Sequence, residues 1–234
     1  MIAGAFFFGR RYAVGMITLT PEECRVLGVM VEKAQTVASS YPITLNALVT
    51  GCNQKNNRFP VTNLSEEKVL DALEGLRQKK LASEVMLSGS RVSKYRHLAR
   101  ETLRVSTLEL VLLAELLLRG PQSLGELRGH ASRMHTIETM EAAQEVLTGM
   151  MTAQSERAAL VKEVPPPAGS RGNRFVQLLC EGLHRLDVAG PGEGDSAEVE
   201  PSKVEKLEAQ IAALNAAVRS LAKRLGEGEP PLVD

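Results

Sequence analysis

The 234-residue sequence has few cysteines, no long apolar run and no net charge. Its three cysteines (Cys24, Cys52 and Cys180) are odd in number and form no CxxC pair, which argues against a disulfide framework or a zinc ribbon and is typical of a reducing compartment. No apolar run reaches the roughly 18 residues that a membrane span needs. The N-terminal arginines follow the apolar block MIAGAFFFG, whereas a secretory signal places its basic residues first. We therefore expect a cytoplasmic protein that does not enter a membrane.

Patterns typical of catalysis and of metal binding are also missing. GxSxG, P-loop and GxGxxG motifs do not occur. His130 and His135 are five residues apart, so on a helix they would point to different faces, unlike the i, i+4 pair of a metal site. Cys52 has no histidine nearby in the sequence. The sequence predicts a protein that is not an enzyme and that holds neither a metal nor a cofactor.

A ten-residue pattern occurs twice. Residues 89–98 read GSRVSKYRHL and residues 169–178 read GSRGNRFVQL. A glycine-containing turn followed by a basic–aromatic pair and an apolar residue predicts the turn and second strand of a β-hairpin. Two copies so far apart indicate two similar domains and not a solenoid.

Helix signals precede each hairpin. Thr20 and Ser106 each have a glutamate three residues later, which is the capping box that opens a helix. Further helices are predicted to start at Thr44 and Ser65, and strands over 82–88 and 92–98 complete the first unit. The helix after Ser106, LELVLLAELLL, is apolar nearly all round, so we expect it to be buried on several sides at the junction of the two units.

Three helices followed by a hairpin are the element order of a winged helix. The predicted fold class is mainly α with small β-hairpins (α+β), formed by two tandem winged-helix domains and a C-terminal coiled-coil helix. Met16 is the expected natural start. The predicted parts are a disordered or mis-assigned extension (1–18), the two winged-helix domains (19–100 and 101–186), a flexible acidic linker (187–202) and the coiled-coil helix (203–226).

The last predicted helix carries apolar residues at alternating spacings of three and four. β-Branched residues at the a positions and leucines at the d positions favour a parallel two-stranded coiled coil. The same pattern also fits an amphipathic helix docked on its own chain. On the first interpretation the protein is a homodimer, with the seam Val204, Leu207, Ile211, Leu214, Val218, Leu221 and Leu225.

A DNA-binding winged helix inserts its third helix into the major groove. With Val69, Leu73 and Leu76 buried, the open face of the first such helix shows Glu66, Glu67, Lys68, Asp71 and Glu74. With Met140, Leu147 and Met150 buried, the second shows Glu138, Glu141 and Glu145. Carboxylates facing phosphates work against the counterion release that drives binding to DNA. Insertion of these helices into a groove is therefore not expected.

Basic and amide side chains lie elsewhere, in the polar loop after the second helix and in the hairpins. They could hold phosphates or a partner, and they could equally cap helices, build turns or pair with nearby carboxylates. The candidate contacts to nucleic acid or to a partner are Asn53, Gln54, Lys55, Asn56, Asn57, Arg58, Arg91, Lys94, Arg96, Arg171 and Arg174. Tyr95 and Phe175, the aromatic members of the hairpins, are expected to pack inward.

Three stretches resemble a known family. YPITLNALVTGCNQKNNRFPV (41–61), LLLRGPQSLGELR (116–128) and the KY and RF hairpins are similar to the YceH-like family of uncharacterised bacterial proteins, over about residues 19–180. The resemblance implies a tandem winged-helix fold, often with a coiled-coil tail, and implies no activity. The first eighteen residues depart from the family pattern.

These observations predict a non-catalytic tandem winged-helix binding protein, a scaffold or adaptor with a protein partner. The alternative is a DNA-binding transcriptional regulator that contacts phosphates through its wings and the 53–58 loop. Residues 20–100 carry 12 basic and 8 acidic side chains, which is well short of the strong basic patch typical of nucleic-acid binding.

Overall fold

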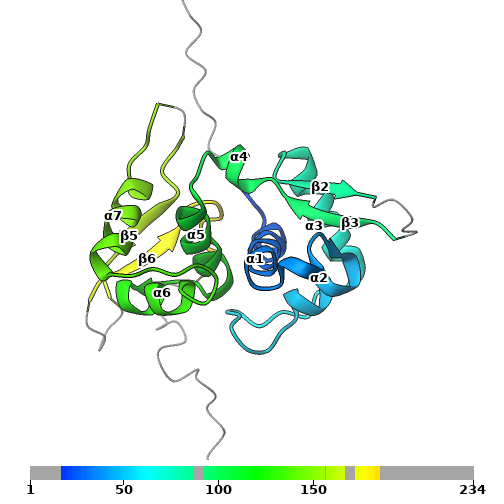
Figure 1. Ribbon diagram of the computed structural model, residues 1–234, viewed down its shortest axis with the longest axis horizontal. Helices are drawn as coiled ribbons and strands as arrows, with labels where there is room; N and C mark the ends of the chain where they lie inside the picture. The colour runs from blue at the N-terminus through cyan, green and yellow to red at the C-terminus, as the bar shows by residue number, and fades with distance from the viewer. Residues whose placement is uncertain (1–16, 87–91, 156, 167–171, 185–234) are drawn as a thin grey trace, which may run out of the picture. The chain divides into compact units, whose positions relative to one another are not determined.

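The computed structural model describes residues 17–86, 92–155, 157–166 and 172–184, which form an α+β fold of two helix–sheet units (Figure 1). The first unit contains α1 (Pro21–Thr36), a 3-10 turn (Ala38–Ser40), β1 (Ile43–Thr44), α2 (Leu45–Cys52), α3 (Glu66–Gln78), β2 (Ala82–Val85) and β3 (Lys94–His97). After the connecting helix α4 (Ala99–Leu103), the second unit contains α5 (Thr107–Arg119), β4 (Gln122–Ser123), α6 (Leu124–Ala131), α7 (Met140–Met151), β5 (Val161–Val164) and β6 (Arg174–Gln177). The second unit thus repeats the order of the first.

The predicted capping boxes are formed. The Thr20 side chain accepts a hydrogen bond from the Glu23 amide, and the Glu23 carboxylate accepts one from the Thr20 amide. Ser106 and Glu109 make the same reciprocal pair at the start of α5. Each box satisfies amide groups that have no partner within the helix, which fixes where the helix begins.

The two sheets have the same topology. Each has three antiparallel strands, in the order β1-β3-β2 in the first unit and β4-β6-β5 in the second. The first short strand pairs with the last one, so that Ile43 faces Tyr95 and Gln122 faces Phe175. Both aromatic side chains are buried, as predicted, and each hairpin presents its aromatic residue to the core.

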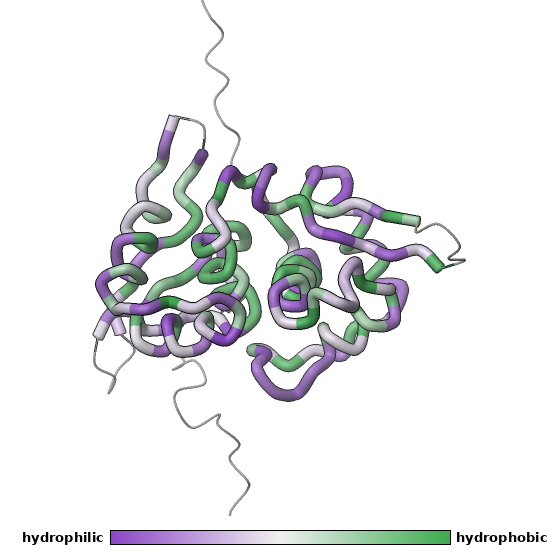
Figure 2. Tube along the Cα trace, viewed as in Figure 1, coloured by the Kyte–Doolittle hydropathy of each residue, from purple (hydrophilic) through white to green (hydrophobic). Residues whose placement is uncertain are grey.

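Helix α5 is buried along most of its length, as its sequence predicts, and it packs against α1. Figure 2 shows apolar (green) stretches in both helices, interrupted by hydrophilic (purple) residues in α1. The contact is close at Gly28, where a Cβ atom would lie 2.8 Å from Leu118 Cγ and 2.9 Å from its Cδ2. The apolar residues of the two units form one continuous core around this helix pair.

Met140 was expected in the core, and this prediction is wrong, because the residue is 36% exposed. Thr139 caps α7, so Met140 occupies the first turn, while the buried face begins one turn later at Ala143 and continues through Leu147 and Met150. Met140 thus lies at the edge of the packing surface, with its Cε 4.0 Å from where a Cβ of the exposed Gly125 of α6 would lie.

Several predicted features lie outside the described residues. They are nearly all of the N-terminal extension (1–16), the wing residues Arg91 and Arg171, the acidic linker (187–202) and the coiled-coil helix with its seam (203–226).

Candidate interaction surfaces

The polar loop that connects α2 to α3 begins at Asn53, whose side-chain amide forms hydrogen bonds with Leu64 at the other end of the loop. Asn53 Nδ2 donates to the Leu64 carbonyl at 2.8 Å, and the Leu64 amide donates to Asn53 Oδ1 at 2.7 Å. The Thr62 hydroxyl donates to the Cys52 carbonyl at 2.9 Å. Asn53 is thus a loop-closing residue whose amide group is already engaged by the chain.

Arg58 is the most heavily bonded side chain of the loop. Its guanidinium makes a bidentate pair with Glu32 of α1, with Nη1–Oε1 at 3.1 Å and Nη2–Oε2 at 2.6 Å. Nε also donates to the Gly51 carbonyl, and Nη2 donates to Gln54 Oε1 at 2.9 Å. The Arg58 side chain has no exposed surface, whereas Glu32 keeps 16% of its side chain exposed. A buried guanidinium with its donors directed at the chain fixes the loop on α1 and is withdrawn from external ligands.

The tip of the same loop reaches α5 in the second unit. The Phe59 amide donates to the Leu118 carbonyl at 2.8 Å. Asn57, whose φ of 61° lies in the left-handed region, accepts a hydrogen bond at Oδ1 from Arg119 Nη2 at 2.5 Å. Asparagine is one of the few residues that adopt this backbone conformation readily. The loop therefore joins the two units.

His184 completes this junction from the C-terminal side. Its Nε2 lies 2.8 Å from the Phe59 carbonyl oxygen, and its ring stacks on Phe59 with the centroids 6.2 Å apart. Burial lowers the pKa of His184 to about 4, although the hydrogen bond to Phe59 acts in the opposite direction. The imidazole is accordingly neutral near pH 7 and donates its Nε2 proton to the carbonyl.

An ion pair within α5 lies next to the loop. Arg119 Nε is 3.0 Å from Glu115 Oε2, an ion pair that lacks the alignment of a hydrogen bond. Burial raises the pKa of Glu115 to about 7, and the positive charge of Arg119 opposes that rise. Burial likewise lowers the pKa of Arg119. The two side chains can be buried because each lies beside the other, and Arg119 also donates to the amide oxygen of Asn57.

The structure therefore divides the loop candidates. Asn53, Gln54, Asn57 and Arg58 all bond within the molecule. Lys55 and Asn56 are exposed at the loop surface. The run CNQKNNR, the most distinctive polar stretch of the sequence, serves mainly as an internal clamp between α1 and α5.

The hairpin candidates divide in the same way. Arg96 is exposed on β3 and its Nε donates to Ser83 Oγ on β2 at 3.1 Å, while Lys94 is partly exposed on the same strand. Arg174 of the second hairpin is buried. Its Nη1 donates to the Pro121 carbonyl at 2.9 Å and lies 3.5 Å from Glu126 Oε2. The described candidate cations on the surface are thus those of the first hairpin and of the loop.

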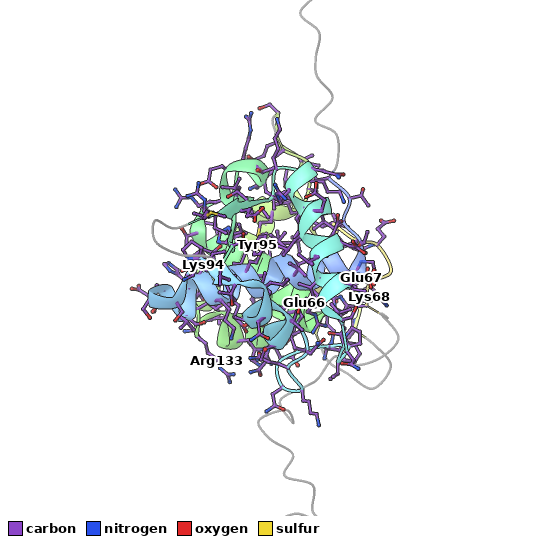
Figure 3. All side chains as sticks on the ribbon, turned by 90° about the vertical axis from the view of Figure 1, so that its right-hand side faces the viewer. Glu66, Glu67, Lys68, Lys94, Tyr95 and Arg133 are labelled. Atoms are coloured by element: carbon purple, nitrogen blue, oxygen red, sulfur yellow. The ribbon has the colours of Figure 1, made fainter. Side chains whose placement is uncertain are left out.

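The acidic faces predicted for α3 and α7 are on the surface. Figure 3 shows Glu66, Glu67 and Lys68 close together on α3, with Lys94 on the other side of the view. Among the described residues, Glu66, Glu67 and Asp71 are exposed and form no ion pair, and Glu74 pairs with Arg77 at 2.9 Å. In the second unit Glu141 and Glu145 are exposed on α7, whereas Glu138, predicted on the same helix face, is exposed just before the N-cap Thr139, because the helix begins only at Met140. None of the three forms an ion pair within the described part of the chain.

Each acidic face also carries one exposed apolar side chain. Leu70 is 40% exposed on α3, between Glu67 and Asp71, and Met140 is 36% exposed at the first position of α7, beside Glu141. An apolar side chain surrounded by carboxylates is a surface that can bury apolar area against a partner of opposite charge.

Neither a metal-binding cluster nor a membrane-spanning helix occurs in the described ranges. No group of three or more His, Cys, Asp or Glu side chains there is placed to hold a metal ion. None of the helices in those ranges has both the length and the apolar character that crossing a membrane requires.

Sequence reasoning missed the partners of the loop. Glu32, Arg119 and His184 were not predicted to contact it, because they lie 26, 62 and 125 residues from their bonding partners in the loop. A carboxylate on α1 and an arginine at the end of an apolar helix carry no local pattern that would connect them to a turn.

Comparison with known proteins finds relatives over most of the chain. A family model described as "Protein of unknown function, DUF480" matches residues 19–170. A UPF0502 protein of Geobacter sulfurreducens is 43% identical over 203 residues, covering 85% of this chain and 90% of the relative. UPF0502 proteins of Burkholderia multivorans and Burkholderia ambifaria are each 39% identical, covering 89% of this chain and 89% of the relative. None of these names states an activity.

The clamp can be tested by removing its central charge. Arg58→Met is expected to lower the free energy of unfolding by about 3 kcal/mol, because the Glu32 carboxylate and the Gly51 carbonyl lose buried donors. Lys55→Met, in the same loop but exposed, is the matched control and should change it by less than about 0.5 kcal/mol. Urea denaturation of both variants measures the difference. Equal effects of the two substitutions would contradict the clamp.

Proposed function

The chain belongs to the DUF480 family, described as proteins of unknown function, and we propose that it is a non-catalytic protein-interaction scaffold built of two winged-helix domains. The order of helices and hairpin in each unit supports the winged-helix assignment. In that fold α3 and α7 occupy the position of the helix that a DNA-binding winged helix inserts into the major groove. The side chains exposed on these two helices, and their charge, therefore decide which kind of partner the units can bind.

The observation that carries the proposal is the charge of α3. Its first turns expose Glu66, Glu67 and Asp71 without an ion pair in the described part, and Lys68 is the one cation among them. Carboxylates near the start of a helix interact favourably with the helix dipole. Placed in a groove, they would face phosphates, and the repulsion would cost affinity where an ordinary reading helix gains it.

The same surface suits a basic protein partner. Complementary charge at the rim raises the rate of association and excludes wrong partners, while Leu70 supplies apolar area at the centre of the face. In the second unit Met140 is exposed at the start of α7 beside Glu141, which gives that unit a face of the same chemical character. Two like faces on one chain are what a scaffold needs to hold two copies of a partner or two related partners.

Binding of DNA through the first hairpin is the second candidate. Lys94 and Arg96 lie on β3 and Lys55 lies on the polar loop, all at the surface. Such cations hold phosphates without reading sequence. Arg58 and Arg174 are buried and form hydrogen bonds within the chain, so fewer cations are exposed than the sequence suggested. This smaller number of surface cations favours the protein partner.

Catalysis is not part of the proposal. Burial raises the pKa of the Cys52 thiol to about 12, so it is a poor nucleophile at neutral pH. Burial also lowers the pKa of His130 to about 4, which is too low for a general base near pH 7. We place the protein in the cytoplasm, where thiols of this kind stay reduced.

A salt titration with random duplex DNA separates the two candidates. The unaltered chain is expected to bind no more tightly than about 10⁻⁴ M at physiological salt, because its α3 acids repel phosphates. Glu67→Lys combined with Asp71→Lys should tighten binding, whereas the control, Glu101→Lys with Glu163→Lys, changes two exposed acids outside α3 and α7 and should have a smaller effect. The same two variants can be used as bait to capture partners from cell extract. The α3 variant should no longer capture the basic partner, whereas the control variant should still capture it. Micromolar binding by the unaltered chain that weakens steeply with salt would support the DNA-binding regulator instead.

We also propose a homodimer through the C-terminal heptads, from Val204 to Leu225. β-Branched and leucine residues alternate there as in parallel two-stranded coiled coils. Light scattering of the full chain should give twice the chain mass, and a chain that ends at Asp187 should give a single chain mass. A full chain that is already monomeric would mean that the helix does not pair with a second copy.

A further inference from the structure

The two units differ in how they hold one cation of the hairpin. Lys94 of β3 and Arg174 of β6 occupy the same place, because each pairs with the N-cap residue of the helix that follows the first strand. In the second unit Glu126, the third residue of α6, lies 3.5 Å from the buried Arg174. The third residue of α2 is Ala47, and Lys94 is partly exposed without an ion pair in the described part of the chain. The first unit thus lacks the carboxylate that the second unit supplies.

Lys94 belongs to a cationic surface of the first hairpin. Lys94 and Arg96 alternate with the buried Tyr95, so both lie on the outer side of β3. Val92, two residues before Lys94, is 57% exposed, and Met86, which follows β2, is 71% exposed. Apolar side chains beside cations form a surface that an acidic partner can cover. We call Val92, Lys94 and Arg96 the hairpin face.

The acidic face of α3 has the opposite charge and a similar composition. Its apolar residue, Leu70, lies one helical turn after Glu66 and Glu67 and next to Asp71, so carboxylates surround it. On α7 the neighbours of Met140 one turn later are Ala143 and Gln144, which carry no charge. The acidic face of α3, made of Glu66, Glu67, Leu70 and Asp71, therefore matches the hairpin face better than α7 does.

One chain does not bring these two faces together. Helix α3 meets β2 at its C-terminal end, where Arg77 lies 3.6 Å from Glu84. The acids lie in the first half of the helix, about 9–17 Å from Arg77 along the axis at about 1.5 Å per residue. Figure 3 shows Lys94 well apart from Glu66 and Glu67. No ion pair within the described residues joins the acidic face to the hairpin face, so each is open to a second molecule.

We propose that the acidic face of α3 binds the hairpin face of a second copy of this chain. The inference rests on the proposed binding role of α3 and identifies the basic partner of that face. The two cations of one copy lie against the carboxylates of the other, and Leu70 packs against Val92. Every copy carries both faces, so each can contribute its helix to one contact and its hairpin to another.

The contact is modest in strength and sensitive to salt. Exposed ion pairs each contribute little and are screened by dissolved ions, so several must act together with the apolar contact. In the second unit Arg174 is buried beside Glu126 and is withdrawn from such a contact. The interaction therefore uses the first unit of each copy.

The test uses the full, unaltered chain as an equal mixture of isotope-labelled and unlabelled copies. A carbodiimide joins carboxylates to lysine amines that are in contact, and peptide mass spectrometry identifies the joined residues. The expected product links Lys94 of one copy to Glu66, Glu67 or Asp71 of another. Its yield should fall at least about threefold when the salt rises from ~0.05 M to ~0.5 M. No such crosslink between copies, or a yield that salt does not change, would overturn the proposal.

Full-length variants separate this contact from chance collisions. Arg96→Glu leaves Lys94 available, and it should lower the yield at least about fivefold because it sets a carboxylate against α3. The matched control, Glu141→Lys with Glu145→Lys, reverses two charges on α7 and should keep the yield within about twofold. A mixture of Arg96→Glu copies with Glu67→Lys copies should give a new crosslink between positions 96 and 67. Equal losses in the two variants, or no new crosslink in the mixture, would count against the proposal.

Failure of this inference can be distinguished from failure of the proposed function. If the crosslink is absent but the unaltered chain captures a basic partner that the α3 variant does not, the acidic face binds another protein and only this inference fails. If the crosslink is absent and the unaltered chain binds duplex DNA in a salt-sensitive way, both proposals fail.

Discussion

Helix α1 approaches α5 closely because residue 28 has no side chain. Leu118 fills the space where a Cβ of Gly28 would lie, and the apolar surfaces of both helices close over this contact. The two helix–sheet units can then share one core, which matters because units of about 80 residues bury too little surface to be very stable alone. The clamp made by the polar loop is possible only at this distance, since Phe59 bonds to the backbone of Leu118 itself.

This arrangement explains why so many distinctive polar residues are not available to partners. Arg58 neutralises Glu32, Asn57 bonds Arg119, and each bond either fixes the loop on α1 or joins it to α5. What remains for recognition is the outer surface, where the acids of α3 and α7 outnumber the cations of the first hairpin and the loop. The interior thus explains the unusual sequence of the loop, and the exterior carries the proposed function.

The sequence predicted those features that depend on neighbours in the chain. The capping boxes at Thr20 and Ser106 are local hydrogen-bond patterns, and the hairpin aromatics Tyr95 and Phe175 follow from strand alternation, so both predictions are confirmed. The family resemblance is confirmed as well. The partners of Arg58 and Asn57 could not be predicted, because they depend on how α1 and α5 pack. The burial of Met140 was predicted wrongly, because hydrophobic periodicity does not show where a packing surface ends. The coiled coil remains a prediction from its heptads.

The close contact of α1 with α5 is tested most directly by adding one methyl group. Gly28→Ala is expected to lower the free energy of unfolding by about 1–2 kcal/mol, because overpacking against Leu118 outweighs the gain that alanine gives a helix. Gly149→Ala, in α7 with open space around its Cβ position, should raise it by about 0.5–1 kcal/mol. If both substitutions stabilised the protein equally in urea denaturation, the two helices would not pack as described, and the shared core and the clamp would lose their basis.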